Sequence, residues 1–281
     1  MKESELKALV VLLDDEDAEV VSHVEDQIRS QGTEIIPFLE QEWEEHFNPT
    51  LQRRLEDLIH LLQFELVQER LAKWNQGDQE DLLEVLWLIS TYQYPDLDYQ
   101  DLSQQIEQVY IETWRELKDG LSPFDQVKII NSVLFDRFKF RANTKNFHSP
   151  ANSMINSVLE SKRGNPISLS SIYLIIARKL GLPVYGVNLP NLFILTYKSD
   201  KLQFYINTFN RGLIFSRDDI VNYIEHLQLP LKDTYFDPCS NYDIAVRFFR
   251  NLVVSFEKLG EYQKSDEVKT LLLALGENYL E

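Results

Sequence analysis

The sequence predicts a mostly helical α+β protein with a small antiparallel sheet. Over most of residues 4–140, apolar residues recur at three- and four-residue steps, as they do on one face of a helix. Short runs of apolar, aromatic and β-branched residues, which are typical of strands, follow between residues 184 and 215. Helical spacing returns between residues 242 and 275. We therefore expect helices, then a central helix against a small sheet, then a final helical pair.

Residues 4–75 carry the stripes of several short amphipathic helices. The first expected helix stops at the acidic run 14–17, the second ends near Gly32, and the third has Pro37 in its first turn. Two further helices are expected, one over residues 51–62 and another over residues 64–71. Their spacing resembles that of HEAT-type helical pairs, which are repeat units. The stripes are Leu6, Leu9, Val10 and Leu13; Val20, Val21, Val24 and Ile28; Ile35, Ile36, Phe38 and Leu39; and Leu51, Leu55, Leu58, Ile59 and Leu62.

After a break at residues 76–78, helices are expected over residues 82–89, 102–117 and 123–140. The segment 92–99 between the first two contains three tyrosines, which either form a recognition surface or pack back on the helices. A small basic cluster stands at the end of the third helix and either holds an anion or is simply solvated. These residues are Tyr92, Tyr94 and Tyr99, and Arg137, Lys139 and Arg141.

The central helix has the clearest local signals. Asn165 is a favourable N-cap, and Pro166 suits the first helical position because its missing N–H needs no partner there. Gly181 is expected to end the helix, because glycine adopts the left-handed conformation common at helix C-termini at the lowest free-energy cost. Pro183 prevents the helix from continuing. One apolar face is expected to consist of Leu169, Ile172, Tyr173, Ile176 and Leu180.

Strands are expected next, over residues 184–187, 192–197 and 202–208, and a turn at residues 198–201 makes the last two a hairpin. A tight turn at residues 210–212 and a short strand at 213–215 precede a helix over 218–227 that Ser216 caps. The final pair consists of a helix from residue 242 to Gly260 and another over residues 268–275.

The stretch from Arg163 to Pro190 reads R-G-N-P-I-S-L-S-x-I-Y…A-x-K-L-G-L-P…G-V-N-L-P. It resembles the central helix and following strands of the transglutaminase-like superfamily, in particular its SirB-type bacterial branch. The phrase R-N-L-V-V-S-F-E-K-L-G-E-Y-Q-K-S, at residues 250–265, is similar to the tetratricopeptide-like helical pair at the C-terminus of that branch. The resemblance runs from about residue 80 to the C-terminus.

Enzymes of this superfamily use a Cys at the start of the central helix, a His on the next strand and an Asp on the strand after it. A thiol at a helix N-terminus has a lowered pKa, the His takes its proton and the Asp orients the His. The positions that match the Cys here offer Pro166 and Ser168. Leu192 stands at the His position and Asn207 at the Asp position. The resemblance therefore implies a member without the reactive triad and without catalytic residues.

Ser168 is the one hydroxyl that could replace the thiol. A serine nucleophile needs a base within hydrogen-bond reach, and the nearest histidine in the sequence is His148, in the loop 146–150. The alternative is that Ser168 caps or lines the first helical turn. A ligand in the old cleft would meet the polar residues Asn165, Ser168, Tyr173, Asn191 and Asn207, which we take as candidate binding residues.

Charge and cysteine usage exclude several classes of function. Residues 1–100 hold 24 acidic and 7 basic side chains, so the formal net charge of −17 lies entirely in this third, which argues against nucleic-acid binding. No apolar run reaches a membrane-spanning length, and the N-terminal residues lack signal-peptide features. The single cysteine, Cys239, excludes an internal disulfide and suits a reducing cytoplasm, while five scattered histidines make no zinc pattern. We expect no metal and no cofactor.

These observations divide the chain into three expected domains. They are an acidic HEAT-like region at residues 1–100, a transglutaminase-like core at 101–235 and a tetratricopeptide-like pair at 236–281. The leading hypothesis is a non-catalytic protein-interaction module in the cytoplasm with an unidentified protein partner. Two alternatives remain: a small-ligand-binding protein that uses the degenerate cleft, and a hydrolase or acyltransferase that uses Ser168.

Overall fold

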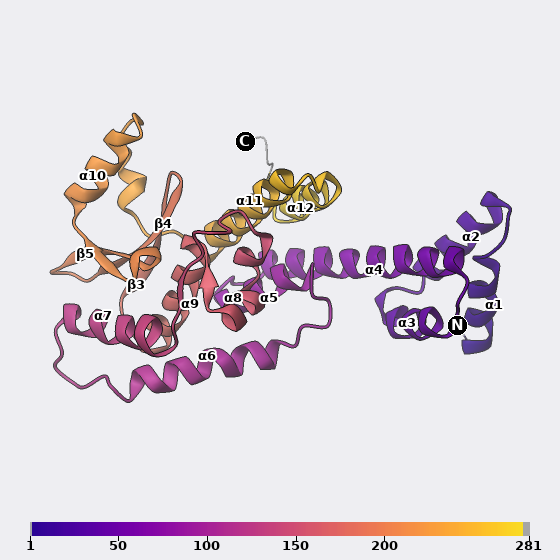
Figure 1. The fold of residues 1–281 in the computed structure, drawn as a ribbon, viewed down its shortest axis with the longest axis horizontal. Coiled ribbons are helices and arrows are strands. Elements are labelled where there is room, and N and C mark those ends of the chain that lie inside the picture. The colour runs from indigo at the N-terminus through magenta and orange to yellow at the C-terminus, as the bar shows by residue number, and fades with distance from the viewer. Residues whose placement is uncertain (1, 278–281) are drawn as a thin grey trace. The chain divides into compact units, whose positions relative to one another are not determined.

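The computed structural model describes residues 2–277 and confirms a mostly helical α+β fold (Figure 1). Two compact units divide the chain, one ending at Arg70 and the other beginning at Leu71. The expected division into three domains with boundaries near residues 100 and 235 stays a prediction. No helix in the described residues is long and apolar enough to cross a membrane.

The first unit contains α1 (Glu3–Leu12), α2 (Ala18–Arg29), α3 (Ile36–Glu45) and most of α4 (Pro49–Gln76). Asp17 caps α2 by accepting a hydrogen bond from the Glu19 N–H at 2.9 Å. The predicted stripes meet in one core, which contains Val10, Leu13, Val24, Ile28, Ile35, Ile36, Leu39, Leu51, Leu55, Leu58 and Leu62. Their assignment to HEAT-type repeats stays a prediction.

The prediction of two helices over residues 51–71 was wrong, because α4 runs without interruption from Pro49 to Gln76. No glycine or proline stands between residues 50 and 76, so no residue type there stops a helix. The buried side also continues past the supposed break, since Leu62 and Leu71 are both fully buried. The helix ends where the Gly77 break was expected.

The second unit holds the remaining elements. Several of its helices begin at side-chain caps, among them Asp81, Asp98, Ser122 and Ser216. The helix expected over residues 123–140 is shorter than expected: regular α-helix stops at Asn131 and a π-helical segment, η2, completes it. The helices are α5 (Leu82–Thr91), α6 (Tyr99–Trp114), α7 (Pro123–Asn131), η2 (Ser132–Arg137), α8 (Ile155–Ser161), α9 (Pro166–Lys179), α10 (Arg217–His226), α11 (Asn241–Leu259) and α12 (Tyr262–Ala274).

The expected antiparallel sheet is present, in the order β3 (Val184–Leu189), β4 (Leu192–Lys198), β5 (Gln203–Asn207), β6 (Leu213–Phe215). One face, which includes Val187, Ile194 and Tyr205, forms a core with α10. The helix α9 packs against β3 and β4. A second sheet, which the sequence did not indicate, pairs β1 (Arg141–Ala142) with β2 (Arg163–Gly164) in parallel just before α9.

The helix α9 is the centre of this unit. The sequence predicted one apolar face, but every residue from Ile167 to Ala177 is buried. The helices α5, α6, α8 and α11 and the strands β3 and β4 all pack on it, so it has no solvent face. Gly181 ends it with φ of +70°, as the sequence indicated.

Two ambiguous segments of the sequence are now resolved by their contacts. Tyr92 is 8% exposed and donates to Glu267 Oε2 at 2.8 Å, and Tyr99 donates to Asp81 Oδ2 at 2.7 Å. These two tyrosines thus pack back on the fold, and Tyr94 alone of the three is exposed. In the basic cluster, Arg137 is ion-paired with Glu112 and Glu116, so its charge is compensated.

Candidate functional site

The start of α9 is held by a capping box. Asn165 Oδ1 accepts a hydrogen bond from the Ser168 backbone N–H at 2.9 Å, and Ser168 Oγ accepts one from the Asn165 N–H at 3.1 Å. The Asn165 amide also donates to Ser153 Oγ at 3.0 Å. Pro166 occupies the first helical position. The predicted cap and first-turn proline are therefore confirmed.

Ser168 lies wholly inside this cap. Its side chain has no exposed surface, and its hydroxyl donates to the Asn165 carbonyl oxygen at 3.2 Å. Gly164 packs so closely against it that a methyl group at residue 164 would overlap Ser168 Oγ. The hydroxyl therefore serves the helix start and is closed to solvent, which matches the structural alternative for this residue.

Leu192 and Asn207 occupy the other two positions taken from the resemblance. Leu192 packs against the core under α10, and Asn207 caps a short helix. Successive side chains of a strand point to opposite faces, and Leu192 packs with Ile194 on the face that α10 covers. Phe193 points to the opposite face. Asn207 Oδ1 accepts a hydrogen bond from the Asn210 N–H at 3.2 Å and caps the short helix η4 (Thr208–Asn210).

Tyr173, the remaining predicted polar contact, is fully buried. Its hydroxyl donates only a long bond of 3.5 Å to the Val127 carbonyl oxygen, and burial raises its pKa above the ordinary value. The side chain is one of the largest fully buried ones among the described residues. It thus acts as core and not as part of a cleft.

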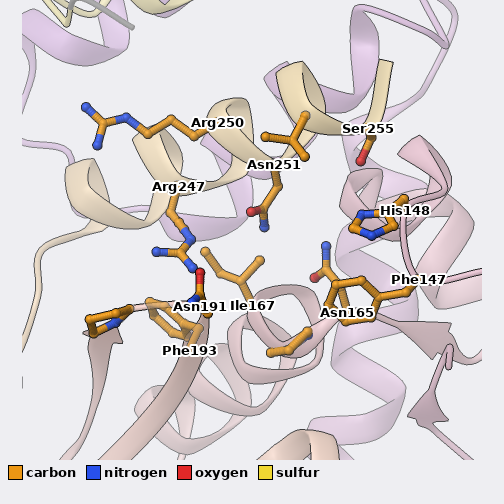
Figure 2. Close-up of a pocket in the computed structure, with 13 residues that line it drawn as sticks. Phe147, His148, Asn165, Ile167, Asn191, Phe193, Arg247, Arg250, Asn251 and Ser255 are labelled. Atoms are coloured by element: carbon orange, nitrogen blue, oxygen red, sulfur yellow. The ribbon is translucent and has the colours of Figure 1, made fainter. Parts of the chain in front are cut away.

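A pocket of about 630 Å³ opens beside the first turn of α9 (Figure 2). This volume is in the range of small-molecule sites, about 300–1,000 Å³. Its walls come from the loop before η3 (Pro150–Ser153), the start of α9, the turn between β3 and β4, and α11. The residues that line it are Phe147, His148, Asn165, Pro166, Ile167, Pro190, Asn191, Phe193, Arg247, Arg250, Asn251, Val254 and Ser255.

Two of the five predicted binding residues, Asn165 and Asn191, line this pocket, together with His148. Asn191 has φ of +57°, a left-handed conformation that asparagine tolerates better than most residues, and so it makes the turn between β3 and β4. Ser168, Tyr173 and Asn207 are not among the lining residues.

The wall from α11 was missed by the sequence analysis. Arg247, Asn251 and Ser255 stand four residues apart, which places them on one face of the helix, and Figure 2 shows all three directed to the pocket. The sequence does contain a signal for this wall, since these three polar residues recur at helical spacing in a segment that also contains many apolar residues. Nothing local, however, linked that face to the loop with Phe147 and His148, about one hundred residues earlier.

The two arginines of the pocket differ in their pairing. Arg247 Nη1 donates to Asn188 Oδ1 at 3.1 Å and, at 3.5 Å, to the Leu189 carbonyl oxygen. Burial lowers the pKa of Arg247, and the nearby charge of Arg250 adds to this effect. Arg250 is ion-paired with Glu277 at 3.2 Å, and in Figure 2 its guanidinium is turned away from the pocket centre.

The charge of the lining is opposite to that of the whole chain. It contains two arginines and a histidine but no aspartate or glutamate, whereas the chain carries a formal net charge of −17. An anion would therefore meet no carboxylate on these walls. Within the described residues, no three His, Cys, Asp or Glu side chains gather in a way that could hold a metal ion.

Cys239, the single cysteine, is packed against the edge strand β3. Its N–H donates to the Gly186 carbonyl oxygen at 2.8 Å, and its sulfur lies where a side chain at residue 186 would otherwise go. Burial, with a smaller effect from Asp243, raises the pKa of the thiol to about 12. Because the thiolate is the nucleophile, this cysteine is a poor one in the folded protein.

We expect iodoacetamide at pH 8 to label Cys239 at least about tenfold more slowly in the folded protein than in urea. The folded state keeps the thiol protonated to about pH 12, whereas the unfolded chain ionises near the ordinary pKa of 9.0. The thiol therefore contributes stability that is present below pH 9 and is lost as the pH rises toward 12. Mass spectrometry of the labelled chain gives the rates, with free cysteine as the reference. Equal rates in the two states would contradict the raised pKa of the folded thiol.

The sequence of this chain is similar to a known protein family and to several known proteins. The model of the family described as "Transglutaminase-like superfamily" matches residues 100–250. A "UPF0162 protein" of Xylella fastidiosa (strain 9a5c) is 28% identical over 204 residues, which is 70% of this chain and 72% of that protein. "F-box only protein 21" of Mus musculus is 41% identical over 68 residues, 24% of this chain and 11% of that protein. No solved structure matches.

Proposed function

Because the chain belongs to the transglutaminase-like superfamily, we propose that it is a non-catalytic member that binds a protein partner through the pocket at the start of α9. The observation that carries this proposal is the first turn of α9. It presents Pro166 and Ile167 to the pocket, while the only hydroxyl of that turn, on Ser168, is buried in the helix cap.

The chemistry available at the family's reactive positions supports a binding role. A nucleophile needs a base within hydrogen-bond reach, and the Ser168 hydroxyl bonds only with the backbone of Asn165 among the described residues. Leu192 can neither accept nor donate a proton. None of these side chains can therefore act as the nucleophile with which acyl transfer by the superfamily's mechanism begins.

The pocket itself remains large and open to a partner. Phe147 and Val254 on its rim are 43% and 37% exposed, and they offer apolar contact area next to polar side chains. Exposed apolar residues around a concave polar site are common where proteins bind ligands and peptides.

Two alternative functions use the same region. Binding of a small ligand would need no residues beyond those that line the pocket. The pocket volume of about 630 Å³ makes small-ligand binding the second candidate function. A hydrolase that uses Ser168 would have to bring its hydroxyl out of the cap, which breaks both hydrogen bonds to Asn165. The geometry therefore favours binding over hydrolysis.

Site-specific photo-crosslinking in the full chain tests the proposal. With p-benzoyl-phenylalanine in place of Val254 on the pocket rim, we expect a covalent adduct with one protein in a lysate of the source cells. The matched control carries the same group in place of Leu273, which is 60% exposed on α12 and does not line the pocket. An adduct at residue 254 and none at 273 supports the proposal. No adduct at 254, or the same adducts at both positions, would overturn it.

A further inference from the structure

The α11 wall of the pocket carries polar groups that the protein leaves unpaired. Ser255 is only 6% exposed, and its hydroxyl has no hydrogen-bond partner among residues 2–277. Figure 2 shows its oxygen directed to the pocket. The amide of Asn251, a half-buried residue one turn away, likewise has no partner in the part of the chain that the structure describes. Both groups line the pocket and are therefore available to hydrogen-bond with a molecule bound there.

Arg247 has one edge of its guanidinium free. Both of its hydrogen bonds, to Asn188 Oδ1 and to the Leu189 carbonyl, come from Nη1. The Nε and Nη2 groups therefore have no partner among the described residues. These two parallel N–H groups form the edge of arginine that binds the two oxygens of a carboxylate.

The first turn of α9 adds a backbone donor on the opposite wall. Pro166 has no N–H, and the N–H of Ser168 is bonded to Asn165 Oδ1. This leaves the N–H of Ile167, a residue that lines the pocket, at the positive end of a 14-residue helix. Donors thus come from both walls, and the lining contains no carboxylate to compete for them.

The lining also contains apolar side chains. Phe193, which is 2% exposed, forms the floor beside Ile167, and Phe147 and Val254 stand at the rim. A small, fully hydrated anion such as phosphate would leave this apolar surface in contact with water. An anion that carries an apolar group would cover it.

We propose that the pocket binds a carboxylate carried by an apolar group, of the kind that the last residue of a peptide presents. The Nε–Nη2 edge of Arg247 binds the carboxylate. Asn251 and Ser255 form hydrogen bonds with the polar groups of the ligand next to the carboxylate, and the apolar group lies against Phe193. This inference rests on the proposed binding function and specifies the chemical class of the group that is bound. A free amphiphilic acid presents the same chemistry as a peptide terminus.

Calorimetric titration of the full chain tests the ligand chemistry. The probes are acetyl-Ala-Ala-Phe with a free carboxylate, the same peptide amidated, acetyl-phenylalanine and inorganic phosphate. We expect the free-acid peptide to bind and the amidated peptide to bind at least about tenfold more weakly. Acetyl-phenylalanine that binds as tightly as the peptide would identify a free acid as the source of the carboxylate. Equal affinity of acid and amide, or binding of phosphate alone, would overturn the proposal.

Variants of the α11 wall test the residues. Arg247→Gln should weaken the free-acid peptide by at least about tenfold and leave the amidated peptide unaffected, and Ser255→Ala should weaken the free-acid peptide by a few-fold. Arg247→Lys keeps the charge but not the forked edge, and should also weaken binding. The matched control is Arg115→Gln, because Arg115 is ion-paired with Glu112 and does not line the pocket, so its loss should change affinity by less than about twofold. Thermal unfolding checks that each variant is folded.

The two proposals fail in different ways. Crosslinking at residue 254 without any effect of amidation or of Arg247→Lys would overturn the carboxylate site and leave the protein-binding function standing. Binding of the free acid without any crosslinked protein would overturn the protein-binding function and support the carboxylate site. If Arg115→Gln weakened the peptide as much as Arg247→Gln, the assignment to the Arg247 edge would be wrong.

Discussion

Replacing Tyr173 with alanine is expected to lower the free energy of unfolding by about 3–5 kcal/mol, the range for removing a large aromatic side chain from a core. Tyr173 has no exposed surface and lies in the middle of α9, which is packed on all sides. Neighbouring elements cannot close a cavity there without moving the central helix. Chemical denaturation followed by circular dichroism measures the loss, and the midpoint of thermal unfolding should fall by roughly 10 °C.

The matched variant Tyr173→Phe separates packing from hydrogen bonding. Its hydroxyl makes only the 3.5 Å bond to the Val127 carbonyl, so its removal should cost less than about 1.5 kcal/mol. Affinity for a ligand of the pocket should not change, since Tyr173 does not line it. A phenylalanine variant that unfolds as easily as the alanine variant would show that the hydroxyl, and not the ring, is what the core needs.

Replacing Gly212 with alanine is expected to lower the free energy of unfolding by about 2–5 kcal/mol. Gly212 has φ of +76°, where a Cβ costs about 1–2 kcal/mol. A Cβ there would also overlap the Asn131 side chain, whose amide donates to the Gly212 carbonyl oxygen at 3.1 Å. Overpacking of this kind typically costs about 1–3 kcal/mol more. Urea denaturation measures the sum.

Gly120→Ala is the control for this substitution. Gly120 has nearly the same φ, +79°, but a Cβ there would have no atom within 4 Å. It should therefore show the backbone cost alone. Combining Gly212→Ala with Asn131→Ala removes the obstructing amide and should recover the packing part of the loss. If Gly120→Ala and Gly212→Ala were equally destabilising, the contact with Asn131 would have no energetic weight.

Local signals were enough to predict many elements of the second unit, although α8 and the sheet of β1 and β2 were missed. The Asn165 cap, the first-turn Pro166 and the left-handed Gly181 act over a few residues, and the ends of α9 follow from them. The same holds for the hairpin of β4 and β5. Where such signals are absent the prediction failed, as in α4, where a change in the apolar stripe was taken for a break although no residue type there ends a helix.

The candidate site depends on contacts that are distant in the sequence. The direction of Leu192 is set by the pairing of β4 with its neighbours, and the burial of Tyr173 is set by the helices that surround α9. The α11 wall, with Arg247 and Ser255, reaches the start of α9 only through the tertiary fold. Spacing along the chain predicts which residues share a helix face, but not which face of another element lies opposite it.

The long sequence separation between α11 and the residues that it contacts near α5 has a consequence for synthesis. Its first residue, Asn241, donates to the carbonyl oxygens of Gln79 and Glu80, both at 2.8 Å, across a separation of about 160 residues. A ribosome that adds about 5–20 residues per second needs roughly 8–30 seconds to span that interval. Throughout that time α5, which packs on α11, is without its final neighbour. The pocket is thus incomplete until α11 has been synthesised, and a nascent chain cannot hold a ligand there before that point.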